Sequence, residues 1–203
     1  MSRNTNQKPV RETVALVGDG QTERIYFSDV KDKDRPKNLT ISPDYPRKLG
    51  SYKGVIDRAI SLKQEGYDRV YALIDMDKIL AENQGATYRQ AKAAAEAIGV
   101  LFLESNPCFE VWLLLHFVYT GRLFSNCSDV VTELRKHIPG YDKSEKFLSA
   151  ASLYGTYKEQ LIENAIIYSR RLEVDRDQQS PQYPRAEVFR FFEWYFESQG
   201  IKI

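Results

Sequence analysis

Pairs of acidic residues follow two short apolar segments of the chain. The segment TVALVGDGQTE carries Asp19 and Glu23, and the segment VYALIDMDK carries Asp75 and Asp77. Buried strands of open α/β sheets deliver functional groups at their carboxyl ends, so we expect these side chains to meet at one place. Carboxylates that meet repel one another unless a cation lies between them. The pattern therefore predicts a divalent-metal site.

A further acid, Glu110, lies in the segment GVLFLESNPCFEVWLLLHF, which also carries Glu104 and is otherwise mostly apolar. A lone buried carboxylate is costly unless it is paired or bound to a metal, so Glu110 is a candidate member of the same site. An arginine partner, helped by the dipole of the helix in which Glu110 lies, is the structural alternative. His116 is expected to be a hydrogen-bonded core residue rather than a ligand.

The two acid pairs also have purely structural interpretations. Asp19 within Gly-Asp-Gly suits a turn, and Glu23 suits the first turn of a helix. If the strand continues through the D-x-D motif, Asp75 and Asp77 point to the same side; if it has ended, they are two solvated acids. Lys78 is the nearest alternative counter-charge for this pair.

Alternating apolar patterns predict the elements that would position these acids. Strands are expected over residues 14–17, 39–41, 70–74 and 100–103. Helices are expected from Glu23 onward, with Thr22 as the cap, and over residues 53–64 and 87–98. This strand–helix alternation predicts an α/β fold with a mainly parallel sheet flanked by helices.

The chain beyond residue 106 has a different pattern, typical of helices only. Asn106-Pro107 is expected to begin the first of them, and others are expected near residues 129–137, 144–152, 156–172 and 185–198. Residues 1–11 are polar and aperiodic, which indicates a flexible tail. We therefore expect a single domain over residues 12–203, with an α/β core at 12–118 and a helical C-terminal part at 119–203.

Composition excludes several classes of protein. The chain has 203 residues and a net charge of +1, so no strong field indicates a nucleic-acid partner. Two cysteines and two histidines exclude a zinc site of the usual spacing and a disulfide framework, and Cys108 and Cys127 are expected to be reduced, packed thiols. With no signal-peptide segment and no apolar run of about 20 residues, we expect a cytoplasmic protein with no membrane partner.

Common enzyme motifs are missing as well. The sequence has no G-x-G-x-x-G, no Walker-type G-x-x-x-x-G-K-[ST] and no G-x-S-x-G. The aromatic stretch over residues 189–196 is expected to pack as a helix rather than to stack on bases.

Three segments, in this order, resemble the RloB-like proteins: GDGQTERIYF, ALIDMDK and SNPCFEVWLLLHF. A fourth segment, QYPRAEVFRFFEWY, falls where that family has an Asn-Pro-x-Thr segment that begins its last helix. The resemblance covers most of residues 12–199. It implies a Toprim-like fold and an association with bacterial restriction–modification or abortive-infection systems.

The resemblance also implies how the acids are used. Toprim domains hold Mg²⁺ with an acid after the first strand, which falls here on Asp19, and with a D-x-D motif, which is here Asp75 and Asp77. Glu23 matches the second acid of the family's E-G-x-T-E motif, and Glu110 matches the acid of its N-P-x-F-E motif. The family usually has glutamate at the position of Asp19, and aspartate is one methylene shorter, which matters because Mg²⁺ demands near-ideal octahedral geometry.

The function that the resemblance implies is a metal-dependent, Toprim-type nuclease that cleaves phosphodiester bonds in defence against phage or foreign DNA. Three acids would hold Mg²⁺ or Mn²⁺: Asp19, Asp75 and Asp77. Three further residues would act in catalysis: Glu23 as general base or second-metal ligand, Glu110 by completing or orienting the cluster, and Lys78 by contacting the scissile phosphate. DNA is favoured over RNA as the substrate, and proteins of the same defence operon are the expected partners.

Two other functions remain open from the sequence. One is a non-catalytic module that binds nucleic acid, a nucleotide or a partner protein, which the near-neutral charge and the shortened acid at position 19 favour. The other is nucleotidyl transfer at the same metal site, which no feature of the sequence separates from hydrolysis.

Overall fold

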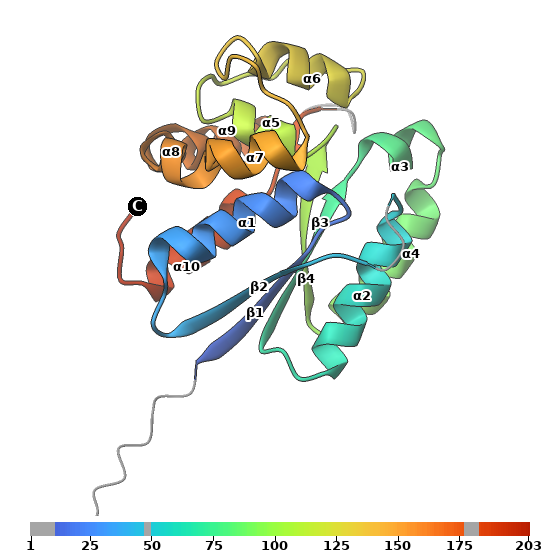
Figure 1. Cartoon of the computed structure of the whole chain (residues 1–203). Helices are drawn as coiled ribbons and strands as arrows, with labels where there is room; N and C mark the ends of the chain where they lie inside the picture. Colours follow the sequence, from blue (N-terminus) through green and yellow to red (C-terminus); the bar gives the residue numbers. More distant parts are fainter. Residues whose placement is uncertain (1–10, 47–49, 177–182) are drawn as a thin grey trace, which may run out of the picture.

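The apolar segments of the sequence form a five-stranded sheet in the order β2-β1-β3-β4-β5 (Figure 1). The computed structural model describes residues 11–46, 50–176 and 183–203. The strands are β1 (Glu12–Val17), β2 (Leu39–Asp44), β3 (Arg69–Asp75), β4 (Val100–Asn106) and β5 (Arg185–Ala186). The first four are parallel and β5 is antiparallel to β4. The predicted fold class, a mainly parallel sheet flanked by helices, is therefore confirmed.

Helices cover both faces of the sheet, which explains why the strands are apolar on both sides. On β1, Val14 and Leu16 face the layer formed by α1 (Gln21–Asp34) and α10 (Phe189–Ser198). Ala15 and Val17 face the opposite layer, formed by α2 (Tyr52–Gln64) and α4 (Gly85–Glu96) (Figure 1). The period of two along the strand thus separates two hydrophobic clusters.

The strand order creates a crevice at the carboxyl ends of β1 and β3. From β1 the chain passes through α1 to β2 on one side, and from β3 it passes through α4 to β4 on the other side. Connections that leave in opposite directions separate at this point, which is where open α/β sheets bind ligands. The short helix α3 (Asp77–Ala81) begins directly beyond β3.

The second half of the chain is helical, as predicted, apart from β5. Its elements are α5 (Glu110–Leu114), α6 (Cys127–Leu134), α7 (Glu145–Ala151), α8 (Leu153–Gln160), a π-helical turn (Leu161–Ala165), α9 (Ile166–Arg176) and α10. Helices α7 and α8 pack against α1 (Figure 1). The division into a core at 12–118 and a helical part at 119–203 stays a prediction.

The aromatic stretch near the C-terminus packs as a helix, as predicted. Phe192 of α10 stacks on Trp112 of α5, with ring centroids 5.5 Å apart, and Phe191 stacks on Tyr195. All four side chains are buried in one hydrophobic cluster that also includes residues of β1 and α1. These rings therefore stabilise the fold and are not a surface for stacking bases.

Two predictions about helix starts are wrong. Asn106-Pro107 does not begin a helix: β4 continues through Asn106, the Asn106–Pro107 peptide bond is cis, and α5 begins only at Glu110. The chain around Arg185 pairs with Asn106 as strand β5, so the last helix begins at Phe189 and not at residue 185. Pairing between these two strands outweighs the local preference for a helix in both segments.

One further local prediction needs correction, and one alternative left open by the sequence is settled. Helix α1 begins at Gln21 with Gly20 as its cap, so Thr22 lies inside the helix and does not cap it. Strand β3 ends at Asp75 and Asp77 begins α3, so the two acids do not share one face of a continuing strand.

Within the described ranges, no helix combines the length and apolar character needed to cross a bilayer. Apart from Arg11, the predicted flexible tail lies outside the described residues.

Candidate functional site

Four of the acids singled out from the sequence lie together at the carboxyl ends of β1 and β3. Asp19 lies in the turn after β1, Glu23 in the first turn of α1, Asp75 at the end of β3, and Glu110 at the start of α5. With Lys143 they line one hollow of about 290 Å³. Four distant segments of the chain therefore bring their carboxylates to one place.

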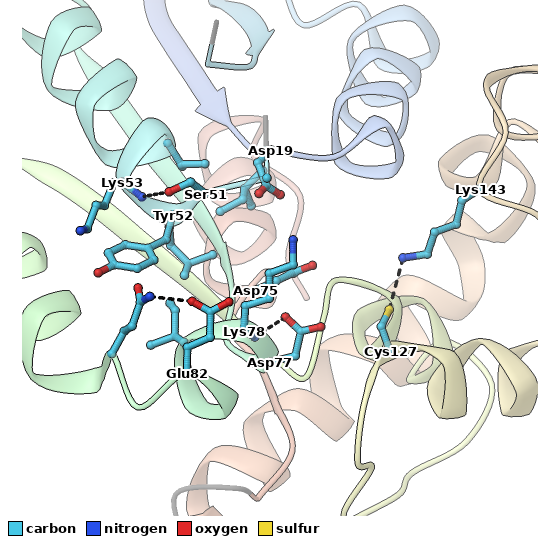
Figure 2. A pocket seen from close by; sticks show the side chains of 16 residues that line it. Asp19, Ser51, Tyr52, Lys53, Asp75, Asp77, Lys78, Glu82, Cys127 and Lys143 are labelled. Atoms are coloured by element: carbon cyan, nitrogen blue, oxygen red, sulfur yellow. Dashed lines mark hydrogen bonds between the residues drawn. The ribbon is translucent and has the colours of Figure 1, made fainter. Parts of the chain in front are cut away.

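Asp77 lines an adjoining cavity of about 360 Å³, which shares Asp19, Asp75 and Lys143 with that hollow (Figure 2). Its Oδ1 accepts a hydrogen bond from the backbone N–H of Lys78, at 2.6 Å. The Lys78 side chain is exposed and lines the same cavity. All six residues predicted for the site therefore line these two adjoining spaces; their roles as ligands and catalysts stay predictions.

Backbone hydrogen bonds fix the end of β3. Oδ1 of Asp75 accepts from the backbone N–H of Phe109 at 2.9 Å, and the backbone N–H of Asp77 donates to the carbonyl of Pro107 at 3.0 Å. The turn that carries the D-x-D motif is thus attached to the segment before α5. Oδ2 of Asp75 has no hydrogen-bond partner among the described residues, so it is available to a ligand.

The glycines on either side of Asp19 make room for Glu23. A Cβ atom on Gly18 would lie 3.1 Å from the Cβ of Glu23, and a Cβ on Gly20 would collide with its Oε2. The Glu23 side chain therefore lies directly over the backbone of the Gly-Asp-Gly turn. This close approach favours glycine at position 18, whereas at position 20 a larger residue would displace the Glu23 carboxylate.

Burial and mutual repulsion make the cluster electrostatically strained. Burial, and then the charge of Glu110, raise the pKa of Glu23 to about 7. Burial, and then the charges of Glu23 and Glu110, raise the pKa of Asp75 well above its usual range. Among the described residues, no lysine or arginine forms an ion pair with Asp19, Asp75 or Asp77. A cation bound among these three carboxylates would favour their charged form.

Glu110 differs from the other acids because a lysine pairs with it directly. Its side chain is 1% exposed, and its Oε1 lies 2.8 Å from Nζ of Lys143. The same oxygen accepts hydrogen bonds from the hydroxyls of Tyr141, at 3.0 Å, and Thr22, at 3.2 Å. Burial lowers the pKa of Lys143, but the charge and hydrogen bond of Glu110, together with the charges of Asp75 and Glu23, outweigh it, and the pKa is raised. The partner is therefore a lysine and not the arginine considered as an alternative.

Lys143 and Tyr141 were not singled out from the sequence. Both lie between α6 and α7, in a segment with no strand or helix period. Their position depends on how the helical half of the chain packs over α5. A local sequence pattern does not predict this packing.

The prediction of two reduced cysteines is wrong. Cys108 and Cys127 form a disulfide, with their Cα atoms 5.6 Å apart, that joins the segment before α5 to the start of α6. The Cys127 sulfur lies 3.1 Å from Oε2 of Glu110 and 3.2 Å from Nζ of Lys143. Cysteine spacing alone gave no sign of this pairing, because the two residues belong to different elements.

Among the described residues, one group of three potential metal-ligand residues has its ligand atoms within 4.8 Å of one another: Cys108, Glu110 and Cys127. Disulfide-bonded sulfurs offer no thiolate, however, so this group is a poor metal site while the bond is intact. Asp19, Asp75 and Asp77 line one cavity but do not meet this spacing, so a shared ion would have to draw their carboxylates together. These three acids offer only carboxylate oxygens, the hard ligands that Mg²⁺ and Mn²⁺ prefer. The donor set of the acid cluster therefore fits these ions better.

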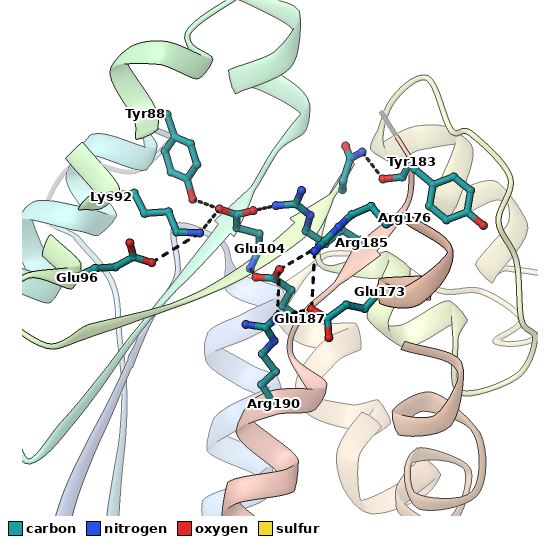
Figure 3. A network of polar contacts seen from close by, with 11 residues as sticks. Tyr88, Lys92, Glu96, Glu104, Glu173, Arg176, Tyr183, Arg185, Glu187 and Arg190 are labelled. Carbon is teal, nitrogen blue, oxygen red and sulfur yellow. Dashed lines mark hydrogen bonds and ion pairs between the residues drawn. The ribbon is translucent and has the colours of Figure 1, made fainter. Parts of the chain in front are cut away.

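Glu104 lies outside the cluster and has a structural role. Its carboxylate accepts from the Tyr88 hydroxyl and from Nζ of Lys92, each at 2.7 Å, and pairs with Arg185. Its backbone N–H donates to Oε2 of Glu187 at 3.1 Å. The network continues to Arg176 and Arg190 (Figure 3). It ties β4 to the start of the C-terminal segment.

His116 is a hydrogen-bonded core residue, as predicted. Its Nδ1 donates to the carbonyl of Trp112 at 2.9 Å, and its Nε2 accepts from the Tyr26 hydroxyl at 3.4 Å. That hydroxyl in turn accepts from the Trp112 indole N–H at 3.1 Å. Burial lowers the pKa of His116 to about 4, so it is neutral at physiological pH.

Comparison with known proteins gives one match. No curated protein and no solved structure matches the chain. The family model described as RloB-like protein matches residues 14–193, which include all the acids of the cluster. The chain therefore belongs to the RloB-like family.

Proposed function

We propose that this protein is a metal-dependent nuclease of the Toprim type that hydrolyses phosphodiester bonds. The observation that carries the proposal is the convergence of Asp19, Asp75 and Asp77 with no ion-pair partner among the described residues. Their place at the crevice between β1 and β3 is where this class of fold builds its sites. Mg²⁺ or Mn²⁺ is the cation whose ligand preference these oxygens meet.

A bound divalent ion would supply Lewis-acid chemistry and an activated water molecule. Asp19, Asp75 and Asp77 would hold it. The pKa of Glu23, raised to about 7, lets its carboxylate take up a proton near neutral pH, which suits a general base. Lys78, exposed in the same cavity, would contact a phosphate oxygen.

Glu110 has a positioning role in this proposal. It is held by Lys143 and Tyr141, and its charge contributes to the raised pKa of Glu23. It would therefore keep the general base near its working protonation state rather than touch the substrate.

The biological setting is also part of the proposal. Membership of the RloB-like family supports action against phage or foreign DNA, together with proteins of a restriction or abortive-infection system. The cytoplasm is the proposed location, on the basis of the sequence alone. DNA is proposed over RNA as the natural substrate.

The direct test is to incubate the purified protein with plasmid, single-stranded DNA and RNA in Mg²⁺ or Mn²⁺. We expect cleavage of at least one substrate, which EDTA abolishes and which Asp75→Asn and Asp77→Asn each reduce at least about a hundredfold. Asp57→Asn, at an exposed position of α2, is the matched control and keeps full activity. Survival of every substrate in both metals, or equal cleavage by wild type and Asp75→Asn, would contradict the proposal.

A second candidate is a non-catalytic binding module that uses the same crevice. It is favoured by Lys143, which already neutralises Glu110 without any metal, and by the short side chain of Asp19. The variant Asp19→Glu separates the two, because a nuclease with this substitution keeps or gains activity whereas a binding module gains none.

A further inference from the structure

Three hollows at the carboxyl edge of the sheet adjoin one another. The 360 Å³ cavity shares Asp19, Asp75 and Lys143 with the 290 Å³ hollow of the acid cluster. That hollow shares Gly20 and Gln21 with a third, of about 230 Å³. Together they form a track that crosses the ends of β2, β1 and β3, with the acids in its middle.

One end of the track has an exposed aromatic ring with a cation over it. Tyr45, directly after β2, has 48% of its surface exposed, and no other aromatic residue among the large apolar side chains of the described ranges is so exposed. The guanidinium carbon of Arg24 lies 5.3 Å from the centroid of its ring. Both residues line the 230 Å³ hollow. An exposed ring beside an arginine is how proteins stack unpaired bases.

The other end of the track carries two lysines. Lys53 and Lys78 are both exposed, both line the 360 Å³ cavity, and neither forms an ion pair with a described residue (Figure 2). Their charges are therefore available to an anionic ligand. Ser51 and Gln84 add polar groups to the same walls.

We propose that the track binds a single strand of nucleic acid across the acid cluster. A base would stack on Tyr45, with Arg24 contacting the phosphate backbone, and the strand would leave past Lys53 and Lys78. This inference rests on the proposed function, because the phosphate to be cleaved would lie over the acids between the two ends.

The size and chemistry of the track favour a single strand over a duplex. Hollows of a few hundred Å³ are comparable to sites for one small ligand or one nucleotide each. In a duplex the faces of the bases are covered by their neighbours, so a duplex cannot stack a base on Tyr45 unless the base leaves the helix. The net charge of +1 also provides no broad basic surface for duplex DNA.

The test is a binding measurement that does not depend on cleavage. Fluorescently labelled strands of about 12 nucleotides, as DNA, as RNA and as a DNA duplex of the same sequence, are titrated with the full chain in Ca²⁺ and in EDTA. We expect both single strands to bind at least about tenfold more tightly than the duplex. Contacts with Arg24, Lys53 and Lys78 predict that log K falls with log salt with a slope of about −2.

Matched variants locate the contact. Tyr45→Ala is expected to weaken single-strand binding about tenfold, and Tyr45→Phe, which keeps the ring, to leave it near the wild-type value. Lys78→Gln is expected to reduce the salt slope by about 0.7, whereas Lys37→Gln, an exposed lysine before β2 at the opposite edge of the sheet, leaves it unchanged.

Each outcome has one meaning. Three results would contradict the proposal that the track binds a single strand: a duplex that binds as tightly as the single strands or more tightly, no binding of any strand, or unchanged binding by Tyr45→Ala. If single strands bind as expected but are not cleaved in Mg²⁺ or Mn²⁺, the binding track is supported and the proposed nuclease function is rejected. A preference between DNA and RNA in the two single-strand arms identifies the sugar that the track accepts.

Discussion

The ammonium nitrogen of Lys143 lies 2.8 Å from Oε1 of Glu110, the most buried acid of the cluster. One of the five acids therefore already has its counter-charge from the protein. Asp19, Asp75 and Asp77 form no ion pair with a described residue, although the charge of Lys143 also acts on Asp75.

Removing the lysine of this pair is expected to destabilise the protein. Lys143→Met leaves a buried carboxylate unpaired and should lower the free energy of unfolding by about 1–2 kcal/mol, less than for a fully buried pair because Lys143 is half exposed. Urea unfolding measures this. The control is Lys136→Met, which removes the ion pair between Lys136 and Glu133. This pair is equally short, but Glu133 is more exposed than Glu110, so the free energy of unfolding should change by less than about 0.5 kcal/mol. Equal effects would show that Lys143 does not hold Glu110.

Removing one charge from the crowded cluster is expected to stabilise the metal-free protein. Asp75→Asn keeps the oxygen that accepts from the Phe109 N–H and removes the repulsion with Glu23 and Glu110. In EDTA at neutral pH, the free energy of unfolding should rise by about 1 kcal/mol. Asp57→Asn, in the exposed surface of α2, should leave it unchanged. A loss of stability in Asp75→Asn would mean that the carboxylates do not repel one another in the folded protein.

Much of this arrangement was predictable from sequence because it follows from local patterns. The strands before Asp19 and Asp75 are short apolar runs, and parallel strands place their carboxyl ends at the same edge of a sheet. Glu110 stood out because a carboxylate in an apolar segment needs a partner. These inferences require only the spacing of apolar residues along the chain and the free-energy cost of burying a charge. Neither depends on the coordinates.

The rest depends on contacts between distant segments. Lys143 reaches Glu110 only because the helical half folds over α5, and Cys108 meets Cys127 for the same reason. The strand pairing of Asn106 with Arg185 replaces the helix start that Asn106-Pro107 would favour alone. Local propensity predicted none of these, since each is decided by tertiary packing.

The disulfide is expected to stabilise the fold by constraining the unfolded chain. It closes a loop over a sequence separation of 19 residues, for which reduction should lower the free energy of unfolding by about 3 kcal/mol. Urea unfolding with and without a dithiol reductant measures this, and the double variant Cys108→Ser, Cys127→Ser should be insensitive to the reductant. Titration of two free thiols in the denatured, unreduced protein would contradict the pairing.

The buried His116 is expected to make stability depend on pH. Its pKa is lowered from 6.5 to about 4 in the folded protein, so below pH 6.5 the unfolded chain binds a proton that the folded chain does not. The contribution of His116 to the free energy of unfolding is thus fully present above pH 6.5. It is lost as the pH falls, by roughly 1.4 kcal/mol per pH unit down to about pH 4.

This contribution is isolated by comparing variants. Urea unfolding between pH 7 and pH 5 should show a shallower loss of stability on acidification in His116→Asn than in wild type, whereas His137→Asn, at the other histidine, should follow wild type. An unchanged pH dependence in His116→Asn would show that the folded protein protonates this ring as readily as the unfolded chain does.

The most direct test of the central claim, that carboxylates from distant segments bind one cation together, is calorimetric titration of the metal-free protein with Mn²⁺. Wild type and Asp57→Asn are expected to bind Mn²⁺ saturably, and Asp75→Asn and Asp77→Asn to bind it at least about tenfold more weakly. Binding of the same strength in all four proteins, or no binding by wild type, would contradict the claim.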